Sequence, residues 1–277
     1  MTDILAEMLS FSFISRALVV GILVSLCASL LGTSLVLKRY SMIGDGLSHV
    51  GYGALALAAA LNLAPLQVAI PVVVAAAFFL LRLSQNSKMK GDALIAIISC
   101  SALSIGMVVV SLFEVSIDVN SYMFGSILAL QSEDVALSVI SSVLVIALYV
   151  LFYNKIFAVT FDESFSKATG IKTNLYNALI ALLTAVVIVV GMRLMGALLI
   201  SGLVIFPSLS AMRICKSYRG VTLTSVAISV VCFVVGLFIT FYIPVPTGAC
   251  IVITNLTAFI ICAIIGKIRS KLSVGKC

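Results

Sequence analysis

The chain is a succession of long apolar runs that are almost free of charge. Each run is close to the ~20 residues that cross a lipid bilayer as a helix. The expected spans are residues 17–37, 43–61, 65–81, 93–113, 135–153, 175–192, 194–212, 221–243 and 248–266. The second and third are short and a tight turn at residues 62–64 joins them, so we expect eight or nine spans. A composition of 62% hydrophobic and 10% charged residues excludes a soluble domain. The pattern therefore predicts an all-α polytopic membrane protein with one membrane domain over residues 1–277.

The basic residues predict the orientation of the spans. Of 17 Lys and Arg residues, all except Arg16 and Arg193 follow the first, third, fifth, seventh or ninth span. Because Lys and Arg accumulate in cytoplasmic loops, we expect the N-terminus outside and the C-terminus inside. This topology accounts for the net charge of +7, so nucleic acid is not an expected partner. Residues 1–15 contain two acids and no cation, and they are not expected to form a cleaved signal peptide.

Asp45 and His49 are polar residues at the head of an apolar run, where ionisable groups are costly and usually functional. Their spacing of four places both on one face of a helix. A carboxylate with an imidazole, here the only one in the chain, forms half of a site for Mn²⁺, Zn²⁺ or Fe²⁺. Two ligands are too few for a metal site, so two copies facing each other across a twofold axis are expected.

The same pair has a simpler interpretation. Asp45 could cap the helix and accept a hydrogen bond from His49, with no metal involved. Four glycines around the pair favour the metal hypothesis, because they would let a second backbone come close. These are Gly44, Gly46, Gly51 and Gly53.

The longest polar segment, residues 155–174, is expected on the cytoplasmic face. Residues 156–160 alternate like a short strand or an extended arm. After them, Asp162 can cap a short amphipathic helix with Glu163 in its first turn, and Gly170 can end it. Outward-facing Phe161 and Phe165 would then dock against another protein. The alternative is a solvated connector that happens to be helical.

Two further stretches are irregular. Residues 120–131 are apolar but too short to span, and they predict either a half-helix re-entering the membrane or a helix lying flat on its surface. Pro207 is expected to kink or break the span at residues 194–212.

Motifs for enzyme chemistry are absent from the sequence. It contains neither a GxxxxGK[ST] phosphate loop nor an HExxH motif, so we expect no ATP hydrolysis or proteolysis by this chain. A secondary transporter driven by an ion gradient stays open, although more intramembrane carboxylates would be expected for it. A permease for a siderophore or cobalamin also stays open, although such ligands do not need the Asp45–His49 pair.

Five stretches in order along the chain carry a resemblance. They are GDGLSH at residues 44–49, YMFGSIL at 122–128, FDESFSKATGI at 161–171, GALL at 196–199 followed by Pro207, and PTGA at 246–249. Together they resemble the permease subunits of manganese, zinc and iron ABC importers, the ABC-3 family. The resemblance covers nearly the whole chain.

The resemblance implies a type II ABC importer permease fold in the plasma membrane of a prokaryote. It implies two permease copies, two cytoplasmic ATP-binding subunits, an extracytoplasmic metal-binding protein and no permanently bound cofactor. Asp45 and His49 would line the path of the transported divalent metal ion. Residues 155–174 would be the coupling segment, with Phe161, Asp162, Glu163, Phe165 and Gly170 meeting the ATPase.

Overall fold

The computed structural model describes residues 12–86, 91–113, 125, 132–243 and 245–274. Eleven helices and no strand occur in these ranges. They are α2 (Ser12–Leu37), α3 (Ile43–Ala60), α4 (Pro65–Asn86), α5 (Gly91–Leu112), α7 (Ser132–Leu151), α8 (Tyr153–Phe161), α9 (Glu163–Ala168), α10 (Thr173–Met195), α11 (Ala197–Ile214), α12 (Tyr218–Tyr242) and α13 (Thr247–Val274). The predicted all-α architecture is confirmed.

Each of the nine expected spans corresponds to a helix, but fewer of them satisfy the criteria for crossing a membrane. Six are long and apolar enough, and α7 with α8 makes a seventh if this pair, bent by 70°, counts as one span. The expected count of eight or nine is therefore above what length and apolarity support. In α3, Asp45, His49 and four glycines lower the hydropathy.

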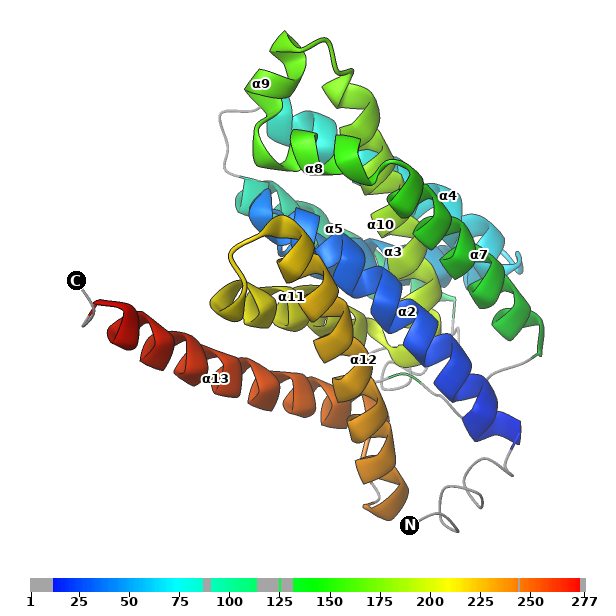
Figure 1. The fold of residues 1–277 in the computed structure, drawn as a ribbon. Helices are drawn as coiled ribbons and strands as arrows, with labels where there is room; N and C mark the ends of the chain where they lie inside the picture. Colours follow the sequence, from blue (N-terminus) through cyan, green and yellow to red (C-terminus); the bar gives the residue numbers. More distant parts are fainter. Residues whose placement is uncertain (1–11, 87–90, 114–124, 126–131, 244, 275–277) are drawn as a thin grey trace.

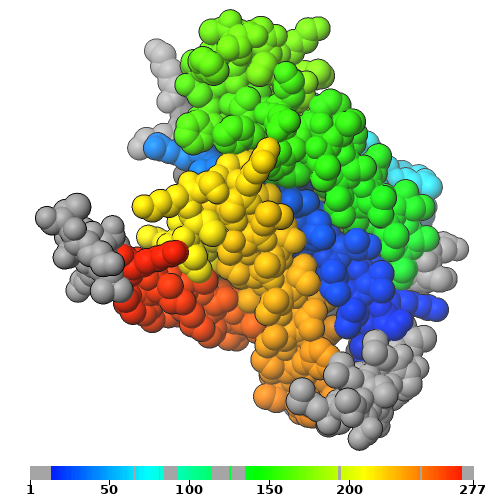
Figure 2. All heavy atoms as spheres, viewed as in Figure 1, coloured from blue at the N-terminus to red at the C-terminus, as the bar shows by residue number. Residues whose placement is uncertain are grey.

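Helices α2 and α10 lie at the centre of the bundle. Buried residues make up 72% of the apolar window of α2 and 67% of that of α10, against 28% for α5 and for α13. Viewed from one side, α2 lies between α7 and α12 and contacts both (Figures 1 and 2). The long α13 packs against α11 and α12, and its end projects beyond the rest (Figure 1).

Small residues set the close packing of α2 against α11 and α12. A methyl group at Gly32 would lie 2.1 Å from the carbonyl oxygen of Val204, so the two backbones nearly touch there. On α12, the Ser229 hydroxyl donates to the Ser25 carbonyl of α2 at 3.1 Å. Such small-residue contacts and interhelical hydrogen bonds are how helices associate in a membrane, where lipid is as apolar as leucine.

The break in the second half of the chain lies at Gly196, not at Pro207. Gly196 has φ +88°, a conformation that suits glycine, and separates α10 from α11. The helix α11 then continues through Pro207 as far as Ile214, so the predicted break at that proline is wrong. Gly125 lies against this junction, because a methyl group on it would be 2.3 Å from the Met195 carbonyl carbon. The remainder of the predicted half-helix at residues 120–131 falls outside the described residues.

The expected strand at residues 156–160 is also wrong, since these residues belong to α8. Ile156, Val159 and Thr160 are its buried residues, and their spacing of three and four is that of a helix face. With α9, α8 forms a cap at one end of the bundle, beside the end of α2 and the start of α10 (Figure 1).

Candidate metal half-site and coupling helix

Asp45 and His49 lie on one face of α3, as their spacing predicts. Asp45 is in the first turn, and its Oδ2 is 3.6 Å from Nε2 of His49. That distance is too long for a hydrogen bond. The N-cap residue of α3 is Met42, which makes no side-chain capping bond. The simpler interpretation, in which Asp45 caps the helix and bonds His49, is therefore wrong.

The separation of the two side chains suits a shared cation. Two ligands each about 2.1 Å from a tetrahedral metal ion lie about 3.4 Å apart, close to the 3.6 Å observed here. The side chains are 47% exposed for Asp45 and 23% exposed for His49, so an ion can reach them. Within the ranges that the structure describes, no group of three or more His, Cys, Asp or Glu residues could hold a metal. The described residues thus bring two possible metal ligands together, Asp45 and His49.

The second imidazole nitrogen of His49 is buried. Its Nδ1 has no hydrogen-bond partner among the described residues. A metal-bound histidine generally donates from its other nitrogen to a carboxylate, carbonyl or water, which fixes the ring. A bound water is the simplest group that would satisfy Nδ1.

The glycines around the pair pack against helices of the same chain. Methyl groups placed on Gly46 and Gly53 would meet α5, at 2.5 Å from Ile95 and 2.8 Å from the Ala102 carbonyl oxygen. Gly51 faces Met192 on α10 in the same way, whereas Gly44 is less crowded. The expected close approach of a second backbone is found at Gly53, where that backbone belongs to α5 of the same chain. The glycines let α3 sit deep among its own neighbours.

The predicted short helix within residues 155–174 is confirmed as α9, although its apolar Phe165 and Ala168 are exposed. Asp162 is its N-cap, and one carboxylate oxygen accepts a hydrogen bond from the backbone N–H of Phe165 at 2.9 Å. Gly170, with φ +82°, follows the end of α9. The first turn holds Glu163, which pairs with Lys167 at 3.1 Å. Contact of these residues with an ATPase stays a prediction.

Two phenylalanines stand out from this cap. Phe161 is 78% exposed and Phe165 is 65% exposed, although both neighbour buried positions. The exposed aromatic surface predicted from the sequence is thus present.

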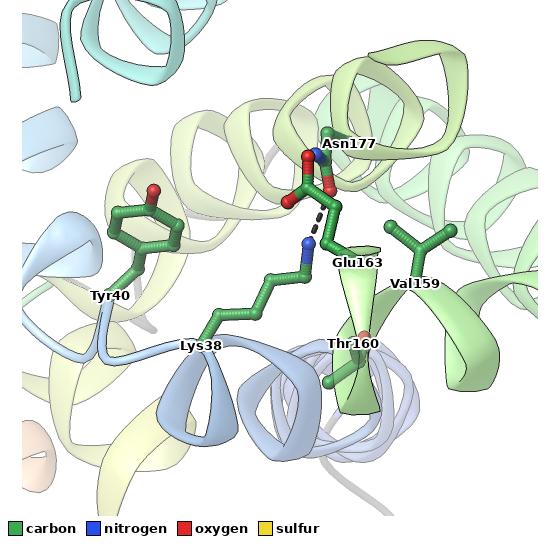
Figure 3. Close-up of a pocket in the computed structure, with 6 residues that line it drawn as sticks. All are labelled: Lys38, Tyr40, Val159, Thr160, Glu163 and Asn177. Carbon is green, nitrogen blue, oxygen red and sulfur yellow. Dashed lines mark hydrogen bonds between the residues drawn. The ribbon is translucent and has the colours of Figure 1, made fainter. Parts of the chain in front are cut away.

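Lys38 and Asn177 were not singled out by the sequence. The Lys38 ammonium donates a hydrogen bond to Oδ1 of Asn177, and the Glu163 carboxylate of α9 lies beside them (Figure 3). In the sequence, Lys38 is one of two adjacent cations after the first span. Only tertiary packing gives Lys38 a partner that its neighbour Arg39 does not share.

A model of the ABC 3 transport family matches residues 10–266. The chain belongs to this family. Among its relatives is the manganese import system permease protein ScaB of Streptococcus gordonii, 30% identical over 91% of this chain and 90% of that protein. The high-affinity zinc uptake system membrane protein ZnuB of Haemophilus influenzae is 27% identical over 91% of this chain and 97% of its own length.

A solved structure of this fold supports the family assignment. The structure described as PsaBC from Streptococcus pneumoniae in complex with Fab matches with a TM-score of 0.84 at 30% identity. The match covers 95% of both chains. This ABC 3 family member therefore has the fold of an ABC transporter permease and is a multi-pass membrane protein.

Proposed function

We propose that this chain is the membrane permease subunit of an ATP-driven importer of divalent transition metal ions, Mn²⁺, Zn²⁺ or Fe²⁺. The observation that carries the proposal is the open Asp45–His49 pair, 3.6 Å apart at the head of α3. Relatives named for manganese import and zinc uptake support the same substrate class. The ligand pair favours a bare ion over a siderophore or cobalamin, because a large organic ligand does not need it.

The transport step follows from the number of ligands. Two copies of the chain contribute two carboxylates and two imidazoles, which suits a divalent metal that accepts both oxygen and nitrogen. When the two α3 helices separate, each half keeps only two ligands. Metal affinity then falls and the ion moves inward. Weak, divided ligation is what a path requires, since an ion that is held too firmly cannot leave.

The energy for this separation comes from another subunit. Because the sequence has no phosphate loop, ATP binds and is hydrolysed on a separate cytoplasmic subunit. Two copies of this subunit are present, and one docks on the α8–α9 cap of each permease chain. Phe161 and Phe165 supply the exposed aromatic contacts of that interface. An extracytoplasmic protein delivers the ion at the opposite face. In this orientation the N-terminus is outside and the C-terminus is cytoplasmic.

The test is metal uptake by the purified permease–ATPase complex in liposomes, comparing Mn²⁺, Zn²⁺ and Fe²⁺. Asp45→Asn and His49→Ala each lower uptake of the preferred metal about tenfold or more, because changing even an outer partner of a metal ligand typically costs at least that much. Assembly with the ATPase is unchanged in both variants. The matched control is Thr257→Val, which removes an exposed hydroxyl that bonds only within α13.

Two results would overturn parts of the proposal. Normal uptake by His49→Ala would remove the pair from the pathway. A wild-type complex that hydrolyses ATP but moves none of the three metals would reject the substrate class.

A further inference from the structure

Three segments of the chain meet at Lys38. This residue directly follows α2, Asn177 lies near the start of α10, and Glu163 opens α9 (Figure 3). The ammonium group of Lys38 donates to the Asn177 side-chain oxygen, and Glu163 lines the same small cavity (Figure 3). The proposed docking helix α9 therefore packs beside α8 and α10, with Glu163 on the same cavity as the Lys38 ammonium.

The cluster is more sheltered than an ordinary surface ion pair. Asn177 is only 2% exposed and Lys38 is partly buried. Burial lowers the pKa of the Lys38 ammonium from its ordinary 10.5, while the nearby Glu163 carboxylate raises it. Burial alone would raise the pKa of Glu163, but bonds from Lys167 and Asn177 and the charge of Lys38 hold it below 4.5. Removing one partner of such a cluster leaves the other uncompensated.

A small cavity beside the cluster gives it room to rearrange. Its volume is about 130 Å³, enough for several waters, and Tyr40, Val159 and Thr160 complete its lining. The hydroxyl of Thr160 is buried and has no hydrogen-bond partner among the described residues. Lys38 can thus exchange partners without breaking a packed core.

From Lys38 the chain reaches the metal ligands through a short, hydrogen-bonded turn. The Tyr40 N–H bonds the Leu35 carbonyl at 2.9 Å, and the Ile43 N–H bonds the Tyr40 carbonyl at 3.0 Å. Helix α3 begins at Ile43 and carries Asp45 in its first turn. Because this turn has little slack, a displacement of Lys38 shifts the start of α3.

We infer that Lys38 is a positioning residue that couples the docking helix α9 to the Asp45–His49 half-site. The inference rests on the proposed function, because it assigns a route by which ATP-driven motion of α9 reaches the metal. When α9 moves, the Glu163 carboxylate draws Lys38 with it and the turn carries the shift into α3. Between these movements of α9, Asn177 keeps the Lys38 ammonium bound to α10.

The experiment measures ATP hydrolysed per metal ion imported by the reconstituted complex, for wild type and four variants. They are Lys38→Met, Glu163→Gln, the double variant Lys38→Glu with Glu163→Lys, and Arg39→Met. The last is the matched control, because Arg39 is the adjacent cation and its side chain is exposed. Metal binding to the ATP-free complex and assembly with the ATPase are measured on the same samples.

We expect Lys38→Met and Glu163→Gln to raise the ATP used per ion about threefold or more, as loss of a coupling contact does. Metal binding and assembly stay at the wild-type level, Arg39→Met behaves as wild type, and the charge swap recovers part of the lost coupling. Wild-type stoichiometry in Lys38→Met would overturn the inference, as would equal losses in Lys38→Met and Arg39→Met. If Lys38→Met does not assemble, the charge-swap variant is the deciding one. If that variant assembles but uses as much ATP per ion as Glu163→Gln, the pairing of Lys38 with Glu163 is rejected. A wild-type complex that imports no metal rejects the proposed function instead, and so the two failures are distinguishable.

Discussion

Gly53 and Gly44 lie on the same helix but are packed very differently. A methyl group at Gly53 would lie 2.8 Å from a backbone oxygen of α5, which cannot rotate away. At Gly44 the nearest atom would be 3.8 Å away, an ordinary contact. Gly53→Ala should therefore destabilise the permease by about 1–3 kcal/mol, the usual effect of overpacking. Gly44→Ala should be neutral or stabilising by up to about 1 kcal/mol, because alanine favours helix.

The measurement is the thermal unfolding midpoint of each purified variant in the same detergent. Gly53→Ala should unfold at a lower temperature than wild type, and Gly44→Ala at the same or a higher temperature. Equal midpoints for the two variants would contradict the packing of α3 on α5.

Spacing within one helix was predictable at the residue scale, whereas partners from distant segments were not. The positions of Asp45 and His49 follow from the helical period alone, so their shared face could be predicted. Nothing local distinguishes Lys38 from Arg39. Their difference arises because one points toward Asn177, 139 positions away in the chain, and the other toward solvent.

The helix pair α8–α9 should bind the ATPase through its two exposed aromatic rings. Phe165→Asp places a charge where we propose an apolar contact, and should weaken binding of the ATP-binding subunit about tenfold or more. Phe113→Asp is the control, since Phe113 is 63% exposed, against 65% for Phe165. Phe113 directly follows α5, and in the proposed topology this end of α5 is the extracytoplasmic one, away from the ATPase. Affinity is measured by titrating the ATPase onto immobilised permease. An equal loss in both variants would mean that the effect is on stability and not on docking.

The same cap shows which element-scale signals are reliable. The N-cap at Asp162 and the helix-ending Gly170 act within a few residues, so α9 could be predicted from its local sequence. The run at residues 156–160 is rich in β-branched and aromatic residues, which favour a strand in isolation. Burial of Ile156 and Val159 against the bundle outweighs that preference and makes α8 a helix.

At the scale of the whole molecule, the low hydropathy of α3 fits its position among other helices, but it does not decide whether α3 crosses the membrane. Helix α3 packs against α4, α5, α10 and α11, and its glycines lie close to these neighbours. An enclosed helix does not need to be apolar all round, and α3 is less apolar than the six helices that are long and apolar enough to cross a membrane. The sequence could predict nine helices, but the number that meets lipid depends on packing.

The proposed sharing of one metal site by two copies makes a quantitative prediction. If each transporter needs both half-sites, mixing equal amounts of wild-type and His49→Ala chains leaves only the pairs of two wild-type chains active. Random pairing makes these about a quarter of the dimers, so uptake should fall to about 25% of the wild-type value. If each chain carried its own complete path, uptake would fall only to about half.

The two chains are co-expressed with different tags, the ratio of tags is verified in the purified complex, and uptake is measured per ATPase. Mixed dimers isolated by both tags in sequence should transport no faster than dimers of His49→Ala alone. The described residues favour this result, since a single chain brings only one carboxylate and one imidazole together.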